Sequence, residues 1–587
     1  MTYTPKLDAL KSATTLQDVA FLLDKTKPSN LSYHLYILGT NRDKSTKEKY
    51  TEFEILKKQG GTRKILAPNK ELKKIQSSLS DFLYDCIEEI NLTRGIKGNL
   101  SYGYQKGISI MNHAKVHSKK KFVFNIDLKD FFDSINFGRV RGFFISNNNF
   151  SLHPKVATIL AQIACHNNSL PQGSPCSPVI SNLIGHIVDI KLAQLAANCG
   201  CSYSRYCDDI TFSTNKKVFP HKIAFSNDRY EYLPSKNLIK IIERSGFEIN
   251  LKKVRMSLFY SQQNVTGLTV NKRVNTPRIY RDTVRALVHH LCFKGDFEFK
   301  GSFKKEKIES KRSEDDEKSI RERKLNSLQG MLNYIARIEC NYREDSLEFK
   351  NSYPKYHKLT KDETVLKNYL LYRYFFNPDR VMIFGEGKTD KSHLQHYLKF
   401  RSEDKLPVPS FFSEWKNIQF GNFENKLFNV ISGSGGTGDI NNIIENYGRW
   451  CKGFHKDTIQ KHLIILVDND IGSKKINQTI LNMKKSQKPI GDEAFYHIHH
   501  NMYVIYLPRM NNEETDIESF YSEKIIDIKV DGRFFEKSKK VSEKGKYPKS
   551  LFASYVVPNN HTLTDWSKFD LIFERVQLAI EDLQSKK

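Results

Sequence analysis

The sequence predicts a multidomain chain that is α+β in its first part and α/β in its last part. A length of 587 residues is too great for one hydrophobic core, so several domains are expected. From Phe122 to about Asn271, short strand-like runs such as FVFNID, YCDDITF and VTGLTV alternate with helical stretches, which is an α+β pattern. Later, VMIFGE and HLIILVD are continuous apolar runs that end in acids, as in the buried parallel strands of a doubly wound sheet.

The composition favours a globular protein with a polyanionic partner. Hydrophobic residues make up 39% of the chain and aromatic residues 12%. There are 93 Lys and Arg against 66 Asp and Glu, which gives a formal net charge of +27. Nucleic acid is the expected partner, and its binding should weaken steeply with salt. A solvated basic surface that only aids solubility is the alternative.

The cysteines and the hydropathy pattern exclude several other classes. The nine Cys include no CxxC pair, so neither a zinc ribbon nor a disulfide framework is predicted. No run approaches the roughly 20 apolar residues of a membrane helix, and MTYTPKLDAL lacks the core of a signal peptide. We expect a cytoplasmic protein without a membrane partner.

The elements divide the chain into four predicted regions. Residues 1–121 combine helical patterns with a basic strand pair, YTEFEILKK and TRKILAP, joined by QGG. Residues 122–275 hold the alternating strands and helices, and residues 276–376 read as helical, with a charged insertion at about 302–325. The NPD at Asn377 and Pro378 breaks the last helix, and residues 378–587 form the α/β region.

Acidic residues lie at the ends of two predicted strands in the second region. Asp127 ends FVFNID, and Asp208 and Asp209 are adjacent in SRYCDDITF. Neighbouring carboxylates repel each other, and strands are depleted in Asp. Either a tight solvated hairpin or a bound divalent cation compensates. Two Mg²⁺ ions held by these carboxylates would suit phosphoryl transfer, since Mg²⁺ takes few protein carboxylates and leaves positions for phosphate oxygens.

Four motifs in order carry a family resemblance. The series NIDLKDFFDSI, LPQGSPCSPVISN, YCDD and GFEINLKKVR resembles the palm of a reverse transcriptase in order and spacing. With GGTRKILAPNKELKKIQ upstream and VTGLTVNKRVNTPR downstream, roughly the first 360 residues resemble the retron reverse transcriptases of bacteria. The resemblance implies a right-hand fold, with residues 1–121 as the N-terminal region and fingers, 122–275 as palm and 276–376 as thumb.

The same resemblance implies residue roles. Asp127 and Asp208 would be metal ligands and Asp209 the third catalytic acid, while Lys252 lies in the motif after YCDD. The implied nucleotide-binding residues are Arg63, Lys64, Phe132, Gln172 and Gly173, with Phe132 screening the sugar 2′-OH. The implied RNA-binding residues are Ala114 and His117 of MNHAKVH, in which His113 replaces the usual Asn, and Val265, Thr266 and Gly267 of the VTG triplet. We expect His113 and His117 at the surface or facing RNA.

A second acidic constellation lies in the α/β region. Glu386 follows the strand VMIFG, and Gly387 allows a sharp turn before a helix capped by Thr389 or Asp390. Asp468 and Asp470 end the strand HLIILV on one face, while Asn469 faces away. Acids at the carboxyl ends of parallel strands converge where such sheets bind ligands, so a second metal site is predicted.

The E-G-x-x-D block followed by D-x-D resembles the Toprim domain of topoisomerases, primases and certain nucleases, over roughly the last 210 residues. The missing zinc motif argues against a primase, and there is no room for a topoisomerase domain. A metal-dependent nuclease remains, with Glu386, Asp468 and Asp470 as catalytic metal ligands. Glu518 of NNEETDIESFY is a further candidate, although acids at a helix N-terminus explain it equally well. The glycines of SGSGGTGDI lack a P-loop lysine, so no ATPase is predicted.

The combined hypothesis is a retron reverse transcriptase fused to a Toprim nuclease. The first part would use Mg²⁺ and deoxynucleotide triphosphates to copy a cognate non-coding RNA into DNA that stays linked to it. The second part, with Mg²⁺ or Mn²⁺, would be a toxic effector in anti-phage defence, acting on DNA or RNA. One alternative is a catalytically silent Toprim-like clamp. Another is an intron-type mobility enzyme, which loses because neither a maturase domain nor a Cys/His-rich endonuclease is visible. The trigger and the number of subunits stay open.

Overall fold

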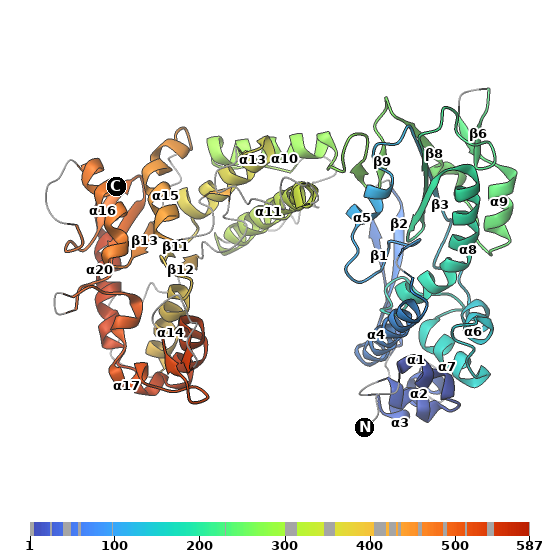
Figure 1. Ribbon diagram of the computed structural model, residues 1–587, viewed down its shortest axis with the longest axis horizontal. Coiled ribbons are helices and arrows are strands. Elements are labelled where there is room, and N and C mark those ends of the chain that lie inside the picture. Colours follow the sequence, from blue (N-terminus) through green and yellow to red (C-terminus); the bar gives the residue numbers. More distant parts are fainter. Residues whose placement is uncertain are drawn as a thin grey trace. The chain divides into compact units, whose positions relative to one another are not determined.

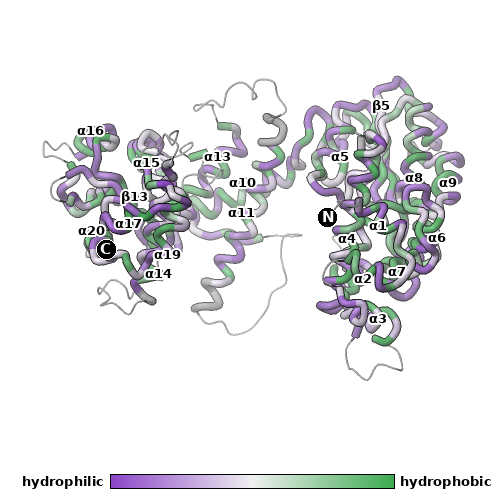
Figure 2. The backbone as a smooth tube through the Cα atoms, turned by 60° about the horizontal axis from the view of Figure 1, so that its bottom comes forward, coloured by the Kyte–Doolittle hydropathy of each residue, from purple (hydrophilic) through white to green (hydrophobic). Residues whose placement is uncertain are grey.

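The computed structural model describes residues 5–23, 26–38, 48–56, 60–96, 98–228, 231–299, 314–344, 359–403, 418–421, 430–431, 436–455, 461–484, 490–510, 513–536 and 545–585. The chain forms two compact units. Unit 1 comprises residues 1–278 and 338–343, and unit 2 comprises residues 279–337 and 344–587. Figure 1 shows the elements of both units, and Figure 2 shows apolar and polar stretches alternating along the chain, as expected for elements with one buried and one solvated face.

Unit 1 begins with helices and a strand pair. The helices are α1 (Lys6–Ser12), α2 (Leu16–Leu22), α3 (Pro28–Tyr36) and α4 (Lys70–Thr93). The predicted hairpin is present as β1 (Tyr50–Leu56) and β2 (Thr62–Pro68), which pair antiparallel in register from Tyr50 opposite Pro68 to Leu56 opposite Thr62. We call this pair the fingers hairpin.

The centre of unit 1 is a four-stranded antiparallel sheet, the palm sheet, in the order β4-β5-β3-β8. Its strands are β3 (Phe122–Asp127), β4 (Ser202–Tyr206), β5 (Asp209–Thr214) and β8 (Arg255–Leu258). The helices of this region are α5 (Ile110–Val116), α6 (Phe137–Ser146), α7 (Pro154–Ala164), α8 (Ser177–Cys199), α9 (Lys236–Glu243) and the 3₁₀ turn η1 (Leu251–Lys253). Two small hairpins complete it, β6 (Ala224–Ser226) with β7 (Tyr232–Pro234), and β9 (Asn264–Val265) with β10 (Leu268–Thr269).

One core joins the helices to the palm sheet. It contains Phe124, Ile126 and Leu128 of the β3 segment, together with apolar residues of α4, α6, α7 and α8. Helix α8 is the one described helix long and apolar enough by composition to cross a membrane, and 56% of that window is buried inside the protein. Its position in the core accounts for its composition.

Two of the strands predicted between Phe122 and Asn271, YCDDITF and VTGLTV, each contain a hairpin turn. Cys207 and Asp208 join β4 to β5, because Tyr206 pairs with Asp209. Thr266 and Gly267 join β9 to β10, because Val265 pairs with Leu268. Cys207, Thr266 and Gly267 have φ values of 58°, 46° and 80°. The left-handed backbone reverses the chain, and hydrophobicity patterns do not reveal it when the turn holds apolar or β-branched residues.

Unit 2 is built on a five-stranded sheet in the order β12-β11-β13-β15-β14. Strands β11 (Val381–Phe384), β12 (Ile418–Gly421), β13 (Leu463–Val467) and β15 (Met502–Tyr506) are parallel, and β14 (Tyr496–His499) is an antiparallel edge. Alternate residues enter two cores, so that Ile465 packs on one face and Ile464 on the other. Burial on both faces explains why these strands read as continuous apolar runs.

Helices cover both faces of this sheet. One core contains apolar side chains of α10 (Arg278–Lys294), α11 (Glu314–Glu344), α13 (Lys361–Leu370), the π-helical η3 (Leu371–Phe376), α15 (Thr437–Trp450) and α16 (Lys474–Lys484). The other takes up α14 (Asp390–Glu403), η8 (Ile517–Phe520), α17 (Glu523–Ile526), η9 (Phe552–Val556), α19 (Val557–Asn559) and α20 (Ser567–Ser585). The remaining short elements are η7 (Ile471–Ser473), β16 (Phe534–Phe535), β17 (Lys546–Tyr547), α18 (Lys549–Leu551) and η10 (His561–Leu563).

The compact units divide the chain differently from the predicted domains. The last helix of residues 276–376 does end at Phe376, before Asn377. However, the helices of that region share a core with the sheet of residues 378–587, and the two compact units divide near residue 278. Of the predicted charged insertion, residues 302–313 lie outside the described residues, and the rest opens α11.

Candidate catalytic centres

The three aspartates predicted for the first centre meet at one end of the palm sheet. Asp127, the last residue of β3, lies directly opposite Asp209, the first residue of β5. Asp208 lies in the turn before β5, and its carbonyl accepts a hydrogen bond of 3.0 Å from the Leu128 backbone N–H. The turn is a tight hairpin, which was one of the two explanations of YCDD, and its geometry is compatible with the other, a bound cation. The structure therefore brings Asp127, Asp208 and Asp209 together.

A glycine in the loop before α5 lets the chain pass close to this turn. A Cβ atom on Gly103 would lie 2.7 Å from both the backbone nitrogen and the Sγ of Cys207. Asn182 of α8 fixes the same loop, because its Nδ2 donates to the Gly103 carbonyl at 2.6 Å. The position of the YCDD turn is thus set by segments from three parts of unit 1.

A fully buried ion pair, Arg205 with Asp189, contacts the backbone of the YCDD turn. Arg205 of β4 donates from Nε and Nη2 to the two carboxylate oxygens of Asp189 in α8, at 2.7 and 2.8 Å. Its Nη1 donates to the Cys207 carbonyl at 2.8 Å, one peptide before Asp208. Both side chains are 0% exposed, and the Tyr203 hydroxyl also donates to Asp189 at 2.6 Å. Because the pair is bidentate and buried, it links α8 rigidly to the catalytic turn.

Burial, and then repulsion between neighbouring carboxylates, raise the pKa of Asp208 and Asp209. Burial, and then the charge of Asp127, raise the pKa of the Asp208 carboxyl, which Lys253 and Arg63 partly offset. Burial, and then Asp208 and Asp127, raise the pKa of Asp209 to about 7. More than a third of Asp209 is exposed, so solvent screens its interaction with the other two carboxylates.

A lysine that the sequence did not single out already neutralises part of this charge. Lys253 Nζ contacts Asp127 Oδ2 at 2.8 Å. The sequence had pointed to its neighbour Lys252, which is exposed. Partial burial lowers the pKa of Lys253, but the hydrogen bond to Asp127 and the charges of the three aspartates raise it overall. Both lysines lie in the 3₁₀ turn η1, and only packing decides which one faces the acids.

The predicted nucleotide-binding residues surround this centre in part. The Leu66 N–H of β2 donates to the Gln172 carbonyl at 2.9 Å, and a Cβ atom on Gly173 would lie 2.6 Å from the Leu66 carbonyl oxygen. Lys64 pairs with Glu52 across the fingers hairpin at 2.7 Å, while the charge of Arg63 acts on Asp208. Phe132 is half-buried. Its ring centroid lies 6.2 Å from that of Tyr104.

Three of the five predicted RNA-binding residues are buried. Ala114 and His117 are 0% exposed and Val265 is 1% exposed, so direct contact with RNA is not supported for them. Only Thr266 and Gly267, in the turn, reach the surface.

The expectation that His113 and His117 lie at the surface is also wrong. Both rings are 0% exposed. His117 bonds the hydroxyls of Ser213 and Ser204, at 2.8 and 2.6 Å. Burial lowers the pKa of His113 to about 4 and that of His117 as well, so both are neutral. The buried histidines at α5 therefore pack against the palm sheet, and His117 bonds to its strands β4 and β5.

The second centre forms at the carboxyl edge of the sheet in unit 2. Glu386 follows β11, and its Oε2 accepts a hydrogen bond of 3.4 Å from the Asp468 N–H after β13. Thr437, at the start of α15, donates its hydroxyl to the other oxygen of Glu386. Thr437 belongs to the glycine-rich stretch, of which residues 432–435 lie outside the described residues. Asn469 points inward and donates to the carbonyls of Gly491 and Leu507, so Asp468 and Asp470 face the other way.

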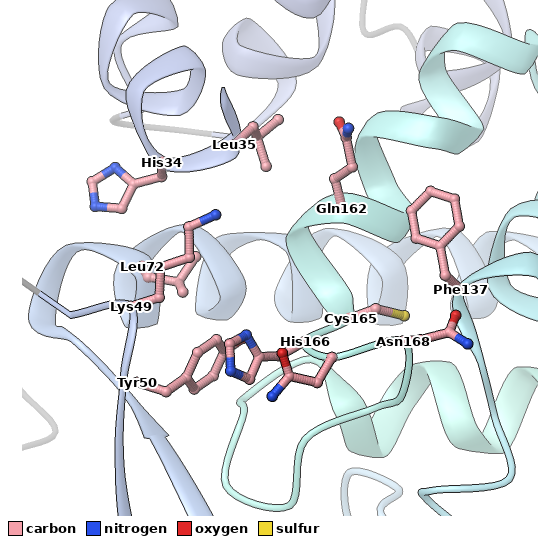
Figure 3. A pocket seen from close by; sticks show the side chains of 11 residues that line it. His34, Leu35, Lys49, Tyr50, Leu72, Phe137, Gln162, Cys165, His166 and Asn168 are labelled. Atoms are coloured by element: carbon pink, nitrogen blue, oxygen red, sulfur yellow. The ribbon is translucent and has the colours of Figure 1, made fainter. Parts of the chain in front are cut away.

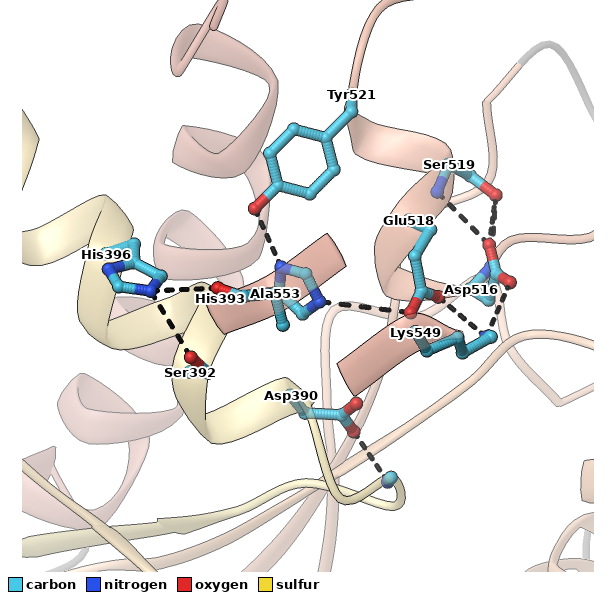
Figure 4. Close-up of polar contacts among 11 residues, drawn as sticks. Asp390, Ser392, His393, His396, Asp516, Glu518, Ser519, Tyr521, Lys549 and Ala553 are labelled. Carbon is cyan, nitrogen blue, oxygen red and sulfur yellow. Dashed lines mark hydrogen bonds and ion pairs between the residues drawn. The ribbon is translucent and has the colours of Figure 1, made fainter. Parts of the chain in front are cut away.

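Further charged residues belong to this centre, since the charges of Asp390 and Asp516 act on Asp468. Figure 4 shows Asp390 together with Asp516, Glu518 and Lys549. The Asp390 carboxylate accepts a hydrogen bond from Gly387 N–H at 2.7 Å. Lys549 Nζ contacts Asp516 Oδ2 at 3.3 Å and Glu518 Oε2 at 2.8 Å. In the sequence Asp390 was a possible helix cap and the last residue of the E-G-x-x-D block, without an assigned role, and Lys549 was not singled out. Because α18 begins at Lys549, its place beside Glu518 depends on how residues 546–551 pack.

Four acids of the second centre also have a raised pKa. Burial, and then the charges of Asp390, Glu386, Asp516 and Asp470, raise the pKa of Asp468 to about 9. Burial is likewise the main cause that raises the pKa of Glu386, Asp390 and Glu518. A cation is the change that would let these carboxyl groups ionise together.

The side chains of both centres are of the types that bind divalent cations. Within the described ranges, no three His, Cys, Asp or Glu side chains already have the spacing of a metal site. Instead a lysine lies against the acids of each centre, Lys253 in the palm and Lys549 in unit 2. In unit 2 the buried oxygen Asp470 Oδ1 has no hydrogen-bond partner among the described residues. Glu518 Oε1 accepts no hydrogen bond there either, but it lies 3.8 Å from the buried His393 Nε2 (Figure 4). Repelling carboxylates beside a positive charge, with a buried carboxylate oxygen that accepts no hydrogen bond, fit divalent cations.

A separate hollow of about 390 Å³ lies away from the aspartates (Figure 3). It is lined by residues of α3, β1, α4, α6 and α7, with Lys49 and Gln162 among them. The rings of Tyr50 and His166 contact each other there, with centroids 4.3 Å apart and planes tilted by 35°. None of the predicted site residues lines it.

Comparisons with known proteins bear on unit 1. The sequence model of the family described as "Reverse transcriptase (RNA-dependent DNA polymerase)" matches residues 55–274. The chain is 33% identical to the retron Ec86 reverse transcriptase of Escherichia coli over 230 residues. This match covers 39% of this chain and 65% of that protein. It is 30% identical over 250 residues to the retron Ec73 reverse transcriptase of Escherichia coli, which covers 40% of this chain and 73% of that protein.

The chain spans less than two thirds of the first of these relatives. Among solved structures, a telomerase of Candida albicans in complex with a fragment of telomeric RNA is similar with a TM-score of 0.31 and 10% identity, over 55% of this chain and 63% of that one. A similarity at that level adds nothing to the assignment.

Proposed function

This chain belongs to the retron reverse transcriptases, and from that premise we propose that unit 1 copies a cognate structured RNA into DNA that remains linked to it. The observation that carries the proposal is the meeting of Asp127, Asp208 and Asp209 on facing strand ends. Such acids suit RNA-directed DNA synthesis, in which positioning and charge neutralisation do most of the work.

The residues of unit 1 divide the work of this reaction. Asp127, Asp208 and Asp209 would hold two Mg²⁺ ions, which activate the attacking hydroxyl and neutralise the leaving pyrophosphate. The ion pair of Arg205 and Asp189 keeps the turn that carries Asp208 in place. Arg63, whose charge already reaches Asp208, supplies positive charge for the triphosphate. Deoxynucleotide triphosphates and the RNA template are the proposed substrates.

Substitution of Asp208 tests this proposal. Asp208→Asn keeps the shape of the side chain but removes its charge, so we expect DNA synthesis on the co-expressed RNA to fall below detection. Asp228→Asn, at an exposed aspartate of unit 1, is the matched control and should synthesise DNA at the wild-type rate. Synthesis by the Asp208→Asn protein at more than a few per cent of the control would contradict the assignment.

For unit 2, the second candidate function is a Toprim-type, metal-dependent nuclease that serves as a toxic effector against phage. Support comes from the acidic edge of the parallel sheet. Glu386 accepts a hydrogen bond from Asp468 N–H there, and the charges of Asp390, Asp470 and Asp516 act on Asp468. Lys549 contacts Asp516 and Glu518. Divalent ions held there, Mg²⁺ or Mn²⁺, would supply an activated water and stabilise the leaving oxygen. Lys549 places an ammonium where negative charge on a phosphate would develop. The RNA-linked DNA made by unit 1 would restrain this activity until infection disturbs it.

Glu386 separates the two activities. We expect Glu386→Gln to leave DNA synthesis intact and to abolish cleavage of nucleic acid and toxicity in cells. Glu523→Gln, at an exposed glutamate of the same unit, is the control. If the wild-type protein cleaves neither DNA nor RNA with Mg²⁺ or Mn²⁺, the silent clamp becomes the better account. If Glu386→Gln still kills cells, the nuclease site lies elsewhere.

A further inference from the structure

Four chain segments meet at the end of the palm sheet that lies opposite the aspartates. There Phe122, the first residue of β3, pairs with Thr214 and Leu258. Lys121 N–H donates to Asn215 Oδ1 at 2.8 Å, and Lys119 N–H donates to the Val270 carbonyl at 3.1 Å. We call residues 119–121, 215–217, 259–261 and 271–272 the basic platform.

The segments that form this end of the sheet carry only positive formal charge, and beside them Arg273 forms an ion pair with Glu339 at 3.8 Å. Residues 115–122, 212–219 and 255–276 contain no Asp or Glu. The platform holds Lys119, Lys120, Lys121, Lys216, Lys217 and Lys272, and all but the half-buried Lys120 are exposed. The strand β3 has six residues, so at roughly 3.3 Å per residue the platform lies roughly 17–20 Å from the catalytic acids. A polyanion bound here would not occupy the reaction centre.

Two aromatic rings project from the same surface. Phe259 is 65% exposed and Tyr260 is 75% exposed, and their centroids lie 5.3 Å apart in an edge-to-face arrangement. Their loop is held by Asn271, whose Nδ2 donates to the carbonyls of Phe259 and Ser261 at 3.1 and 2.6 Å. Rings kept exposed on a fixed backbone are suited to stacking with unpaired bases.

A polar hollow lies beside these lysines. It has a volume of about 510 Å³ and is lined by Lys120 and Lys216 together with Ser202, Ser213, Thr214 and Asn215. Ammonium, hydroxyl and amide groups are the donors that contact phosphate and sugar oxygens in nucleic-acid complexes. The hollow thus adds phosphate-binding groups to a surface that already offers stacking rings.

We propose that the basic platform is a second nucleic-acid site, which binds unpaired nucleotides of an RNA strand away from the reaction centre. The lysines contact the phosphates, and Phe259 and Tyr260 stack with bases. An anionic membrane surface is disfavoured as the partner, because the described residues of the platform combine two exposed rings with a polar hollow and form no continuous apolar face. The site holds part of the RNA in place while another part is copied, and binding at it does not require synthesis.

Fluorescence anisotropy with a labelled single-stranded RNA of 15 nucleotides tests the proposal. The full-length protein is titrated at several salt concentrations with a chelator present, so that neither synthesis nor cleavage occurs. The charge variant is Lys119→Gln with Lys121→Gln and Lys272→Gln. Each lost phosphate contact lowers the slope of log K against log salt by about 0.7, so the slope should fall by about 2. Its control changes the exposed Lys155, Lys236 and Lys240 to Gln.

The stacking variant is Phe259→Ala with Tyr260→Ala, and its control is Phe21→Ala with Tyr36→Ala, at residues 83% and 46% exposed on α2 and α3. Stacking is worth about 1–3 kcal/mol per base, so binding of single-stranded RNA should weaken about 10- to 100-fold, with duplex RNA less affected. The controls should stay within about twofold of wild type.

Each outcome decides the matter. The proposal is overturned if either platform variant binds single-stranded RNA as its control does. It is also overturned if the variants lose binding to vesicles that contain phosphatidylserine while RNA binding is unchanged. DNA synthesis on a poly(rA) template with an oligo(dT) primer should be unchanged in the variants. A wild-type protein that fails this synthesis assay would count against the polymerase proposal and not against the platform.

Discussion

Replacement of Arg205 by Met should destabilise unit 1 strongly, because it leaves the Asp189 carboxylate buried without its partner. Arg205 makes two hydrogen bonds of 2.7 and 2.8 Å to Asp189 and one of 2.8 Å to the Cys207 carbonyl, with both ionic side chains 0% exposed. Loss of one member of a buried pair costs about 3–5 kcal/mol. We therefore expect the free energy of unfolding of unit 1 to fall by that amount.

The three tryptophans of the chain make the measurement specific. Trp415, Trp450 and Trp566 all belong to unit 2, so tryptophan fluorescence reports on that unit alone. In urea unfolding of the full chain, Arg205→Met should move the transition seen by far-ultraviolet circular dichroism and leave the fluorescence transition in place. A multidomain chain need not unfold in two states, so the two probes are analysed separately.

A double substitution isolates the ion pair. Arg205→Met together with Asp189→Leu removes both charges, so most of the loss should be recovered. About 1–3 kcal/mol should remain lost, because the Cys207 carbonyl and the Tyr203 hydroxyl lose partners. The coupling energy between the two positions should exceed about 2 kcal/mol. A loss below about 1 kcal/mol in Arg205→Met, or strictly additive single effects, would refute the reasoning.

Three further predictions follow from the same contacts. Gly173→Ala should raise the KM for deoxynucleotide triphosphates severalfold with a smaller change in kcat, because φ is 129° and the new Cβ would lie 2.6 Å from the Leu66 carbonyl oxygen, displacing the fingers hairpin. An unchanged KM would show that the hairpin does not set the nucleotide site. Lys253→Met should slow DNA synthesis at least tenfold while Lys252→Met leaves it within about twofold, since only Lys253 contacts Asp127; equal effects in steady-state rates would contradict this assignment. The raised pKa of Asp468, about 9, means that folded unit 2 binds more protons than the unfolded chain, so without metal its stability should fall as pH rises from about 4 to 9. Thermal unfolding followed by tryptophan fluorescence at pH 5.5 and 8.5 should show this loss, with Mg²⁺ restoring stability at the higher pH, and Asp468→Asn should flatten it; a stability that rises with pH would argue against the cluster.

Local patterns were sufficient for the parts of each centre that a single element determines. Strands that end in acids were visible as apolar runs, so Asp127, Glu386 and Asp468 could be placed at strand ends without coordinates. The alternation of side chains along a strand also placed Asn469 on the inward side. The turn inside YCDD stayed one of two alternatives because an apolar Cys occupies the left-handed position, where Gly or Asn would have indicated a turn directly.

The sequence by itself determined the order of the motifs, the acids at strand ends and the basic charge of the chain. Only the tertiary structure decided that Lys253 and not Lys252 faces Asp127, that His113 and His117 are buried, and that Asp390 and Lys549 join the acids of unit 2. The reason is the range of the forces involved. Periodicity within an element fixes which side a residue faces, whereas the partner that approaches from more than a hundred residues away depends on how whole elements pack.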